Sequence, residues 1–96
     1  MTKYADVVHT DPDAIAALQA WLPQLPELAQ VLVRLDDGSQ VSGTVSIRPT
    51  LQTFRDREER EGINGVVRLD DLLHPEQQHY VWLDRIREVQ PLVPTS

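Results

Sequence analysis

Two alternating runs of apolar and polar residues predict a β-hairpin in the first half of the chain. In residues 31–35 and 41–47 an apolar side chain recurs at every second position, which is the period of a strand. The linking residues DDGS suit a tight turn, because Gly38 tolerates a positive φ. Gly43 stands inside the second run, where an inward side chain is expected. A glycine there marks strong bending or another backbone passing close, so we expect a barrel corner.

A helical pattern precedes the hairpin. Asp11 can cap the first backbone amides, Pro12 suits the first turn, and Pro23 stops the helix. Apolar side chains fall on one face at helical spacing, at Ile15, Leu18 and Leu22. The pattern predicts a helix over 12–22 that packs on the protein's own core, and docking on a partner is the alternative.

The second half of the chain predicts further strands around a charged segment. We expect strands over 29–36, 40–48, 65–71, 78–84 and 86–90, followed by a tail over 92–96. Residues 49–63 form a charged insertion containing FRDREEREG, and Asn64-Gly65 signals a turn. Periodicity does not decide whether the insertion is an extended arm or a short helix closed by Gly62, and we expect it to be solvated.

Length and composition indicate one globular domain. The chain has 96 residues, of which 41% are hydrophobic and 25% charged. The absence of cysteine excludes disulfides and thiolate zinc sites and suits the cytoplasm. The first residues, MTKYADVVHTDPD, lack the apolar region of a signal peptide. The most apolar window, residues 14–22, is far shorter than a membrane span, so we expect no membrane association.

The charge balance argues against a nucleic-acid partner. The formal net charge is −6, and nucleic-acid affinity depends largely on basic groups that neutralise phosphates. Eight arginines against a single lysine still allow a local basic patch.

One helix followed by five bent strands resembles the Sm-like fold of the Sm, LSm and Hfq proteins, including a small bacterial family of single-domain members. The resemblance spans most of residues 12–91. Its motifs are Val31-x-Val33-x-Leu35-x-x-Gly38-x-x-Val41-x-Gly43-x-Val45, Val66-x-x-Leu69-x-Asp71, and the run from Tyr80 to Pro91. It implies a mainly β fold: an N-terminal α-helix and a five-stranded, strongly bent antiparallel sheet forming a small open barrel.

The departures from this family fall on its RNA-binding positions. Sm proteins bind single-stranded RNA with an Asp and Asn pair after the second strand, where this chain has Pro49 and Thr53. Their Arg-Gly between the last strands is replaced by Trp82-Leu83, and the Lys-His of Hfq by Leu83-Asp84. These changes remove phosphate contacts, so the RNA pocket of the family does not carry over.

No pattern of catalytic or metal-binding residues stands out. His74 and His79 would need a third ligand such as Asp70 or Asp71, and ordinary loop histidines are the simpler interpretation. Paired aspartates at turns and strand ends do not indicate acid–base catalysis, and no nucleophile motif is present. We therefore expect no enzymatic activity, no catalytic residues, no cofactor and no metal.

The sequence supports two functional hypotheses. The first is a non-enzymatic Sm-like module that self-associates through strand edges and binds a protein partner. A dimer is expected rather than a ring, because the insertion lengthens a loop that ring-forming relatives keep short. The alternative is weak binding of single-stranded RNA, through base stacking and altered, arginine-based contacts. The candidate RNA-binding residues are Arg48, Arg55, Arg57, Arg60, Trp82 and Arg85.

Overall fold

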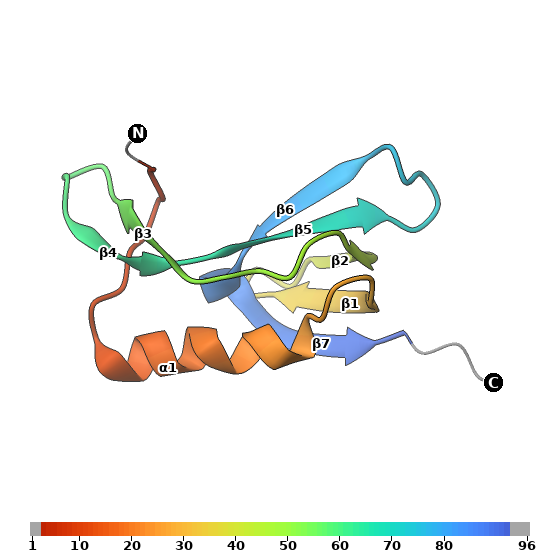
Figure 1. Cartoon of the computed structure of the whole chain (residues 1–96), viewed down its shortest axis with the longest axis horizontal. Coiled ribbons are helices and arrows are strands. Elements are labelled where there is room, and N and C mark those ends of the chain that lie inside the picture. The colour runs from red at the N-terminus through yellow and green to blue at the C-terminus, as the bar shows by residue number, and fades with distance from the viewer. Residues whose placement is uncertain (1–2, 93–96) are drawn as a thin grey trace.

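A computed structural model describes residues 3–92 (Figure 1). The predicted tail lies outside the described residues except for Leu92. The helical elements are α1 (Pro12–Trp21), η1 (Leu22–Gln24) and η2 (Leu83–Arg85). The strands are β1 (Gln30–Leu35), β2 (Gln40–Val45), β3 (Gln52–Arg55), β4 (Glu61–Asn64), β5 (Val66–Asp71), β6 (Gln78–Trp82) and β7 (Ile86–Pro91).

The main sheet curls until its two ends come close together. Its five antiparallel strands have the order β6-β5-β2-β1-β7. The strands at the two ends of this order, β6 and β7, are joined only by η2, which has three residues. Such a short link requires the sheet to bend back on itself, as in a small open barrel.

The helix begins where the sequence predicts. The side chain of Asp11 accepts a hydrogen bond of 3.0 Å from the amide of Ala14, and Pro12 occupies the first turn. Its buried residue Leu18 and the following Leu25 belong to the barrel core. The remaining buried core residues come from the main sheet and η2: Val31, Val33, Leu35, Val45, Val67, Leu69, Val81, Leu83, Ile86 and Val89.

Gly43 is required by close contact between neighbouring strands. It pairs with Val31 of β1 on one side and with Asp71 of β5 on the other. A Cβ atom at Gly43 would lie 2.6 Å from the backbone oxygen of Asp70 and 2.9 Å from Cβ of Leu69. Of the two explanations for a glycine inside a strand, the close backbone approach is therefore present at this position.

The charged insertion folds into a second sheet, the hairpin of β3 and β4, which the sequence did not predict. It is a hairpin rather than a free arm or a helix, although its charged residues 57–61 are exposed to solvent as expected. The buried carboxylate of Asp56 forms its turn by accepting hydrogen bonds from the amides of Glu58 at 2.9 Å and Arg60 at 3.0 Å. The N-terminal segment adds to this sheet through bridges from Tyr4 to Arg55 and from His9 to Ile63.

Several predicted boundaries need correction. α1 ends at Trp21, because Leu22 already belongs to η1. β2 ends at Val45, three residues before the predicted end, and Leu83–Asp84 belong to η2 rather than to β6. Asn64-Gly65 is not a turn: Asn64 is buried at the end of β4, and Gly65 alone separates β4 from β5.

Candidate functional site

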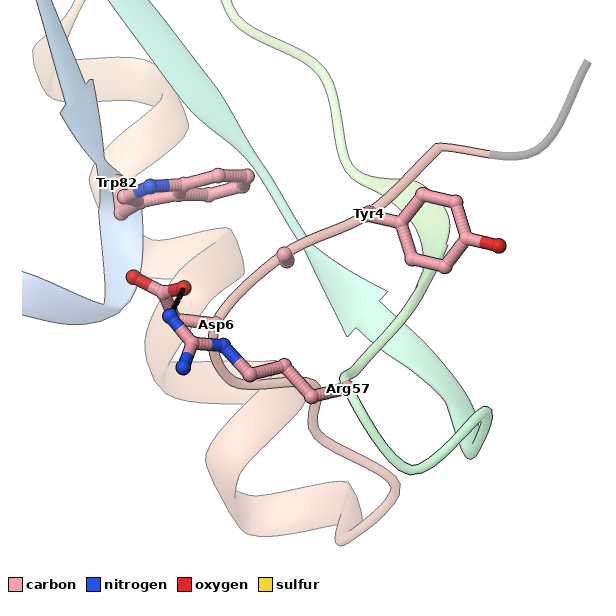
Figure 2. Close-up of a pocket in the computed structure, with 5 residues that line it drawn as sticks. Tyr4, Asp6, Arg57 and Trp82 are labelled. Carbon is pink, nitrogen blue, oxygen red and sulfur yellow. Dashed lines mark ion pairs between the residues drawn. The ribbon is translucent and has the colours of Figure 1, made fainter.

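Trp82 forms one wall of a shallow hollow between the N-terminal segment and the tip of the β3–β4 hairpin (Figure 2). The hollow has a volume of about 280 Å³ and is lined by Tyr4, Ala5, Asp6, Arg57 and Trp82. Trp82 points outward because its neighbours Val81 and Leu83 alternate into the core. Among the candidate residues, the structure therefore brings Trp82 and Arg57 together.

Trp82 already packs against another aromatic side chain. Its indole meets Phe54 edge to face, with ring centroids 5.3 Å apart and an interplanar angle of 77°. Phe54 comes from β3 and is buried, so this contact fixes the insertion against the end of β6. The arrangement gives Trp82 a packing role and leaves it half-buried.

Arg57 carries its own counter-ion in the hollow. Its Nη2 atom lies 3.6 Å from Oδ1 of Asp6, and both side chains are exposed (Figure 2). An exposed pair of this kind contributes about 0–1 kcal/mol to stability. The carboxylate of Asp6 also repels an incoming phosphate, so the hollow is poorly suited to a nucleic-acid backbone.

Two further candidate arginines are paired within the hairpin. Arg55 contacts Glu59 at 3.3 Å and Glu61 at 3.0 Å, and these carboxylates, Glu59 first, raise the pKa of Arg55. Arg60 contacts Asp56 at 2.9 Å and Glu58 at 3.5 Å. Hydrogen bonds to Asp56, with the backbone amide of Arg60 first, lower the pKa of that carboxyl. Both guanidinium groups thus lie among carboxylates.

Arg85 holds η2 against the β1–β2 turn. Its guanidinium contacts Asp36 at 3.2 Å and Asp37 at 2.9 Å, which raises the pKa of Arg85. The amide of Asp36 donates to the backbone oxygen of Arg85 at 2.8 Å. The pKa of Asp37 is lowered, first by the hydroxyl of Ser39 and to a smaller extent by Arg85. This network gives Arg85 a structural role at the sheet bend.

Arg48 lies apart from the other candidates, between β2 and β3. Within residues 3–92 it makes no ion pair and donates no hydrogen bond to another side chain or carbonyl. It borders a separate hollow of about 590 Å³ beside the end of α1. The candidate residues therefore do not form one continuous basic patch.

Two of the three histidines are paired with aspartates, and Nδ1 of the exposed His74 lies 3.7 Å from Oε1 of Glu76. Nε2 of His79 lies 3.0 Å from Oδ1 of Asp71, and Nε2 of His9 lies 3.0 Å from Oδ2 of Asp84. In the part of the chain that the structure describes, no group of three or more His, Cys, Asp or Glu residues is placed to hold a metal ion. No helix among residues 3–92 is long and apolar enough to cross a membrane.

Sequence reasoning missed the contribution of the N-terminal segment. The amide of Ala5 donates to the carbonyl of Arg55, and Asn64 donates to the carbonyl of Val7, both at 2.9 Å. Gly62 lets the segment approach, since a Cβ there would lie 2.9 Å from the backbone of His9. The adjacent β-branched residues Val7 and Val8 are a local signal for extended structure, but too short a run to predict a strand.

A curled antiparallel sheet preceded by a helix defines an Sm-like fold, and comparison with known structures supports this classification. The chain is similar to a protein described as "The crystal structure of XC5848 from Xanthomonas campestris adopting a novel variant of Sm-like motif". The two are 45% identical with a TM-score of 0.90, and the match covers 97% of this chain and 100% of that chain. Residues 2–92 match the family described as Domain of unknown function (DUF3247), and the chain belongs to that family. Comparison with curated proteins finds no match.

Proposed function

We propose that this protein is a non-enzymatic, cytoplasmic Sm-like module that self-associates through the edges of its main sheet and binds a protein partner. The observation that carries the proposal is the open edge on both β6 and β7, the outermost strands of the five-stranded sheet. Unpaired strand edges present backbone donors and acceptors that a second chain can pair with. The absence of cysteine agrees with a reducing compartment.

The hydrogen-bond register identifies which groups face the open edge of β6. The amide of Leu83 donates to the carbonyl of Gly65, and the amide of Asp71 donates to the carbonyl of Gln77. Hydrogen-bonded and non-hydrogen-bonded pairs alternate along an antiparallel ladder, so the amide of Tyr80 points away from β5. Its side chain is 65% exposed and adds apolar area beside this edge.

The corresponding register on β7 places a proline at the outer edge. The amide of Leu92 donates to the carbonyl of Gln30, so the next pair, Val31 with Pro91, is a non-hydrogen-bonded pair. The backbone nitrogen and carbonyl of Pro91 therefore point away from β1, toward the open edge. A proline is tolerated there because no ladder hydrogen bond is needed. Pro91 limits the pairing that β7 can offer near its end, which favours a short interface and hence a dimer.

RNA binding is the second candidate function. It is favoured by the position of Trp82 and Arg57 on one hollow. It is disfavoured because five of the candidate groups are already engaged: Arg55, Arg57, Arg60 and Arg85 by carboxylates, and Trp82 by Phe54. We rank self-association first for this reason.

Light scattering coupled to size exclusion, over a range of protein concentrations, tests the proposal. The wild-type chain should elute with a mass above that of a monomer. Tyr80→Pro removes an outward-facing amide and should shift the protein to monomer, whereas the control Tyr80→Ala keeps the amide and should weaken association less. Circular dichroism verifies that both variants are folded. A monomer mass for the wild type at high micromolar concentration would refute self-association.

A further inference from the structure

The groove between the end of α1 and the segment that follows β2 combines apolar walls with a free guanidinium. Its volume is about 590 Å³. Leu22 and Pro23 from the helical side, and Pro49 and Leu51 from the other, supply apolar wall area, and Arg48 lies at the same groove. We propose that this groove binds an extended segment of a partner protein in which an apolar side chain lies close to a carboxylate.

The charge of the partner follows from the ion pairs of the protein itself. Six of the eight arginines lie within 4.0 Å of a carboxylate: Arg34, Arg55, Arg57, Arg60, Arg68 and Arg85. Arg87 donates to the carbonyls of Asp84 and Ile86. Among residues 3–92, Arg48 alone of the arginines has neither kind of partner. In a chain of net charge −6, Arg48 is thus the arginine of the described residues whose guanidinium is most available to an incoming anion.

The extended form of the partner follows from the backbone of the same segment. Between β2 and β3 the chain is extended but belongs to no strand (Figure 1), and only the amide of Ser46, at its start, donates to the carbonyl of Arg68 in β5. Within the described residues, the amides of Ile47, Arg48 and Leu51 donate to no protein acceptor. An extended peptide can form backbone hydrogen bonds with unpaired amides and place its side chains in adjacent apolar pockets. The backbone hydrogen bonds contribute affinity, and the pockets contribute specificity.

The apolar surface continues beyond the groove. Ile47 is 67% exposed, and Leu28 is 72% exposed at a φ of +69°, a conformation that leucine rarely adopts. The amide of Leu28 donates to the carbonyl of Val45 at 2.8 Å, which holds this leucine next to the end of β2. A leucine kept exposed in a strained conformation at the end of β2 adds apolar surface next to the start of the segment that leads into the groove.

A peptide titration followed by ¹⁵N–¹H NMR tests the inference. The probes are blocked heptapeptides that place leucine or valine one to three residues from an aspartate or glutamate, each with a twin in which the acid is replaced by its amide. At least one acidic peptide should give saturable shifts confined to residues 19–23 and 47–51. Its amide twin should bind about tenfold more weakly, because a charge-assisted hydrogen bond is lost.

Matched arginine variants locate the charge that matters. Arg48→Ala should weaken the acidic peptide about tenfold, while Arg87→Ala removes the same charge outside the groove and should leave binding within about twofold. The inference would be overturned if no peptide bound saturably at millimolar concentration, or if the amide twins bound as tightly as the acidic peptides. Chemical-shift changes at residues outside the groove would also overturn it. So would octanoate or an oligo(U) strand that binds the groove more tightly than the peptides.

The inference deepens the partner-binding part of the proposed function and does not depend on self-association. A monomer that binds the peptides would refute self-association and keep the groove as a binding site. An oligomer that binds none of the peptides would support self-association and refute the groove as a binding site.

Discussion

Trp82 and Phe54 meet edge to face, 5.3 Å between ring centroids, although they belong to different sheets. Phe54 lies in the hairpin formed by the charged insertion, and Trp82 lies where β6 turns into η2. The insertion is therefore packed against the bend of the barrel through an aromatic pair. Its charged residues line the outer side of a hairpin whose inner side is part of the fold.

A double-mutant cycle measures this contact. Phe54→Ala should lower the free energy of unfolding by about 3–5 kcal/mol, because a buried ring is removed. The coupling between Phe54→Ala and Trp82→Ala should be about 0.5–1.5 kcal/mol in urea unfolding. Leu73→Ala is the control, since Leu73 is 85% exposed and its loss should cost less than about 0.5 kcal/mol. A coupling of zero would show that the rings are merely adjacent.

The close approach of β2 and β5 predicts a strong effect at Gly43. Gly43→Ala places a methyl group 2.6 Å from the carbonyl oxygen of Asp70, so the backbone of β2 or β5 must move. We expect a loss of about 1–3 kcal/mol, and a larger loss for Gly43→Val. Gly38→Asn is the control, because the space around Gly38 is open and asparagine accepts its φ of +86° better than other residues do. Thermal melts that rank Gly38→Asn as the more harmful change would contradict this account.

The loop between β5 and β6 predicts a pH-dependent contribution from Asp71. Its carboxylate accepts hydrogen bonds from His79 first and then from the amides of His74 and Leu73, and these bonds lower the pKa of Asp71. A lowered pKa in the folded state stabilises the protein above the ordinary aspartate pKa of about 3.9, and this contribution is lost as the pH falls through the folded pKa.

Unfolding of Asp71→Asn compared with wild type at a series of pH values tests this. The variant should be less stable at pH 7, and the difference in stability should shrink as the pH falls below about 4. Glu27→Gln is the control, because Glu27 is exposed and makes no ion pair within the described residues. A difference that stays constant from pH 7 to pH 3 would show that the carboxylate charge of Asp71 is not involved.

The parts of the fold that could be predicted are those with local signals. Asp11 and Pro12 fix the start of α1, and Gly38 fixes the hairpin turn, within a few residues of the element they control. The β3–β4 hairpin could not be predicted, because its turn depends on the buried side chain of Asp56 inside a run of charges. In such a run the strand alternation is hidden, since outward positions and turn positions are both charged.

The pairing of the candidate arginines could not be predicted for a related reason. Arginine content indicates available charge, but some of the carboxylate partners come from distant segments, as Asp6 does for Arg57 and Asp36 does for Arg85. Only the folded chain shows which guanidinium groups remain free. Nothing in the sequence distinguishes Arg48 from the other arginines.

These pairings predict weak RNA binding. Carboxylates next to Arg55, Arg57, Arg60 and Arg85 neutralise most of the charge that would contact phosphates, and the net charge is −6. The affinity for oligo(U) or oligo(A) should be no tighter than about 10⁻⁴–10⁻⁶ M at physiological salt, the range of non-specific contacts. Fluorescence anisotropy with labelled oligonucleotides across a salt series measures both the affinity and the number of phosphates contacted.

Two variants identify the source of any RNA affinity that is found. Arg57→Ala should weaken binding and flatten its salt dependence if phosphate contacts in the hollow contribute, with Arg87→Ala as the charge-matched control. The RNA affinity of Trp82→Ala is compared with that of Phe54→Ala, because both variants disturb the aromatic pair but only Trp82 lines the hollow. Loss of binding in Trp82→Ala alone would indicate base stacking. A nanomolar, sequence-selective complex that survives physiological salt would reverse the ranking of the two functions, since it would require contacts that outweigh the paired carboxylates.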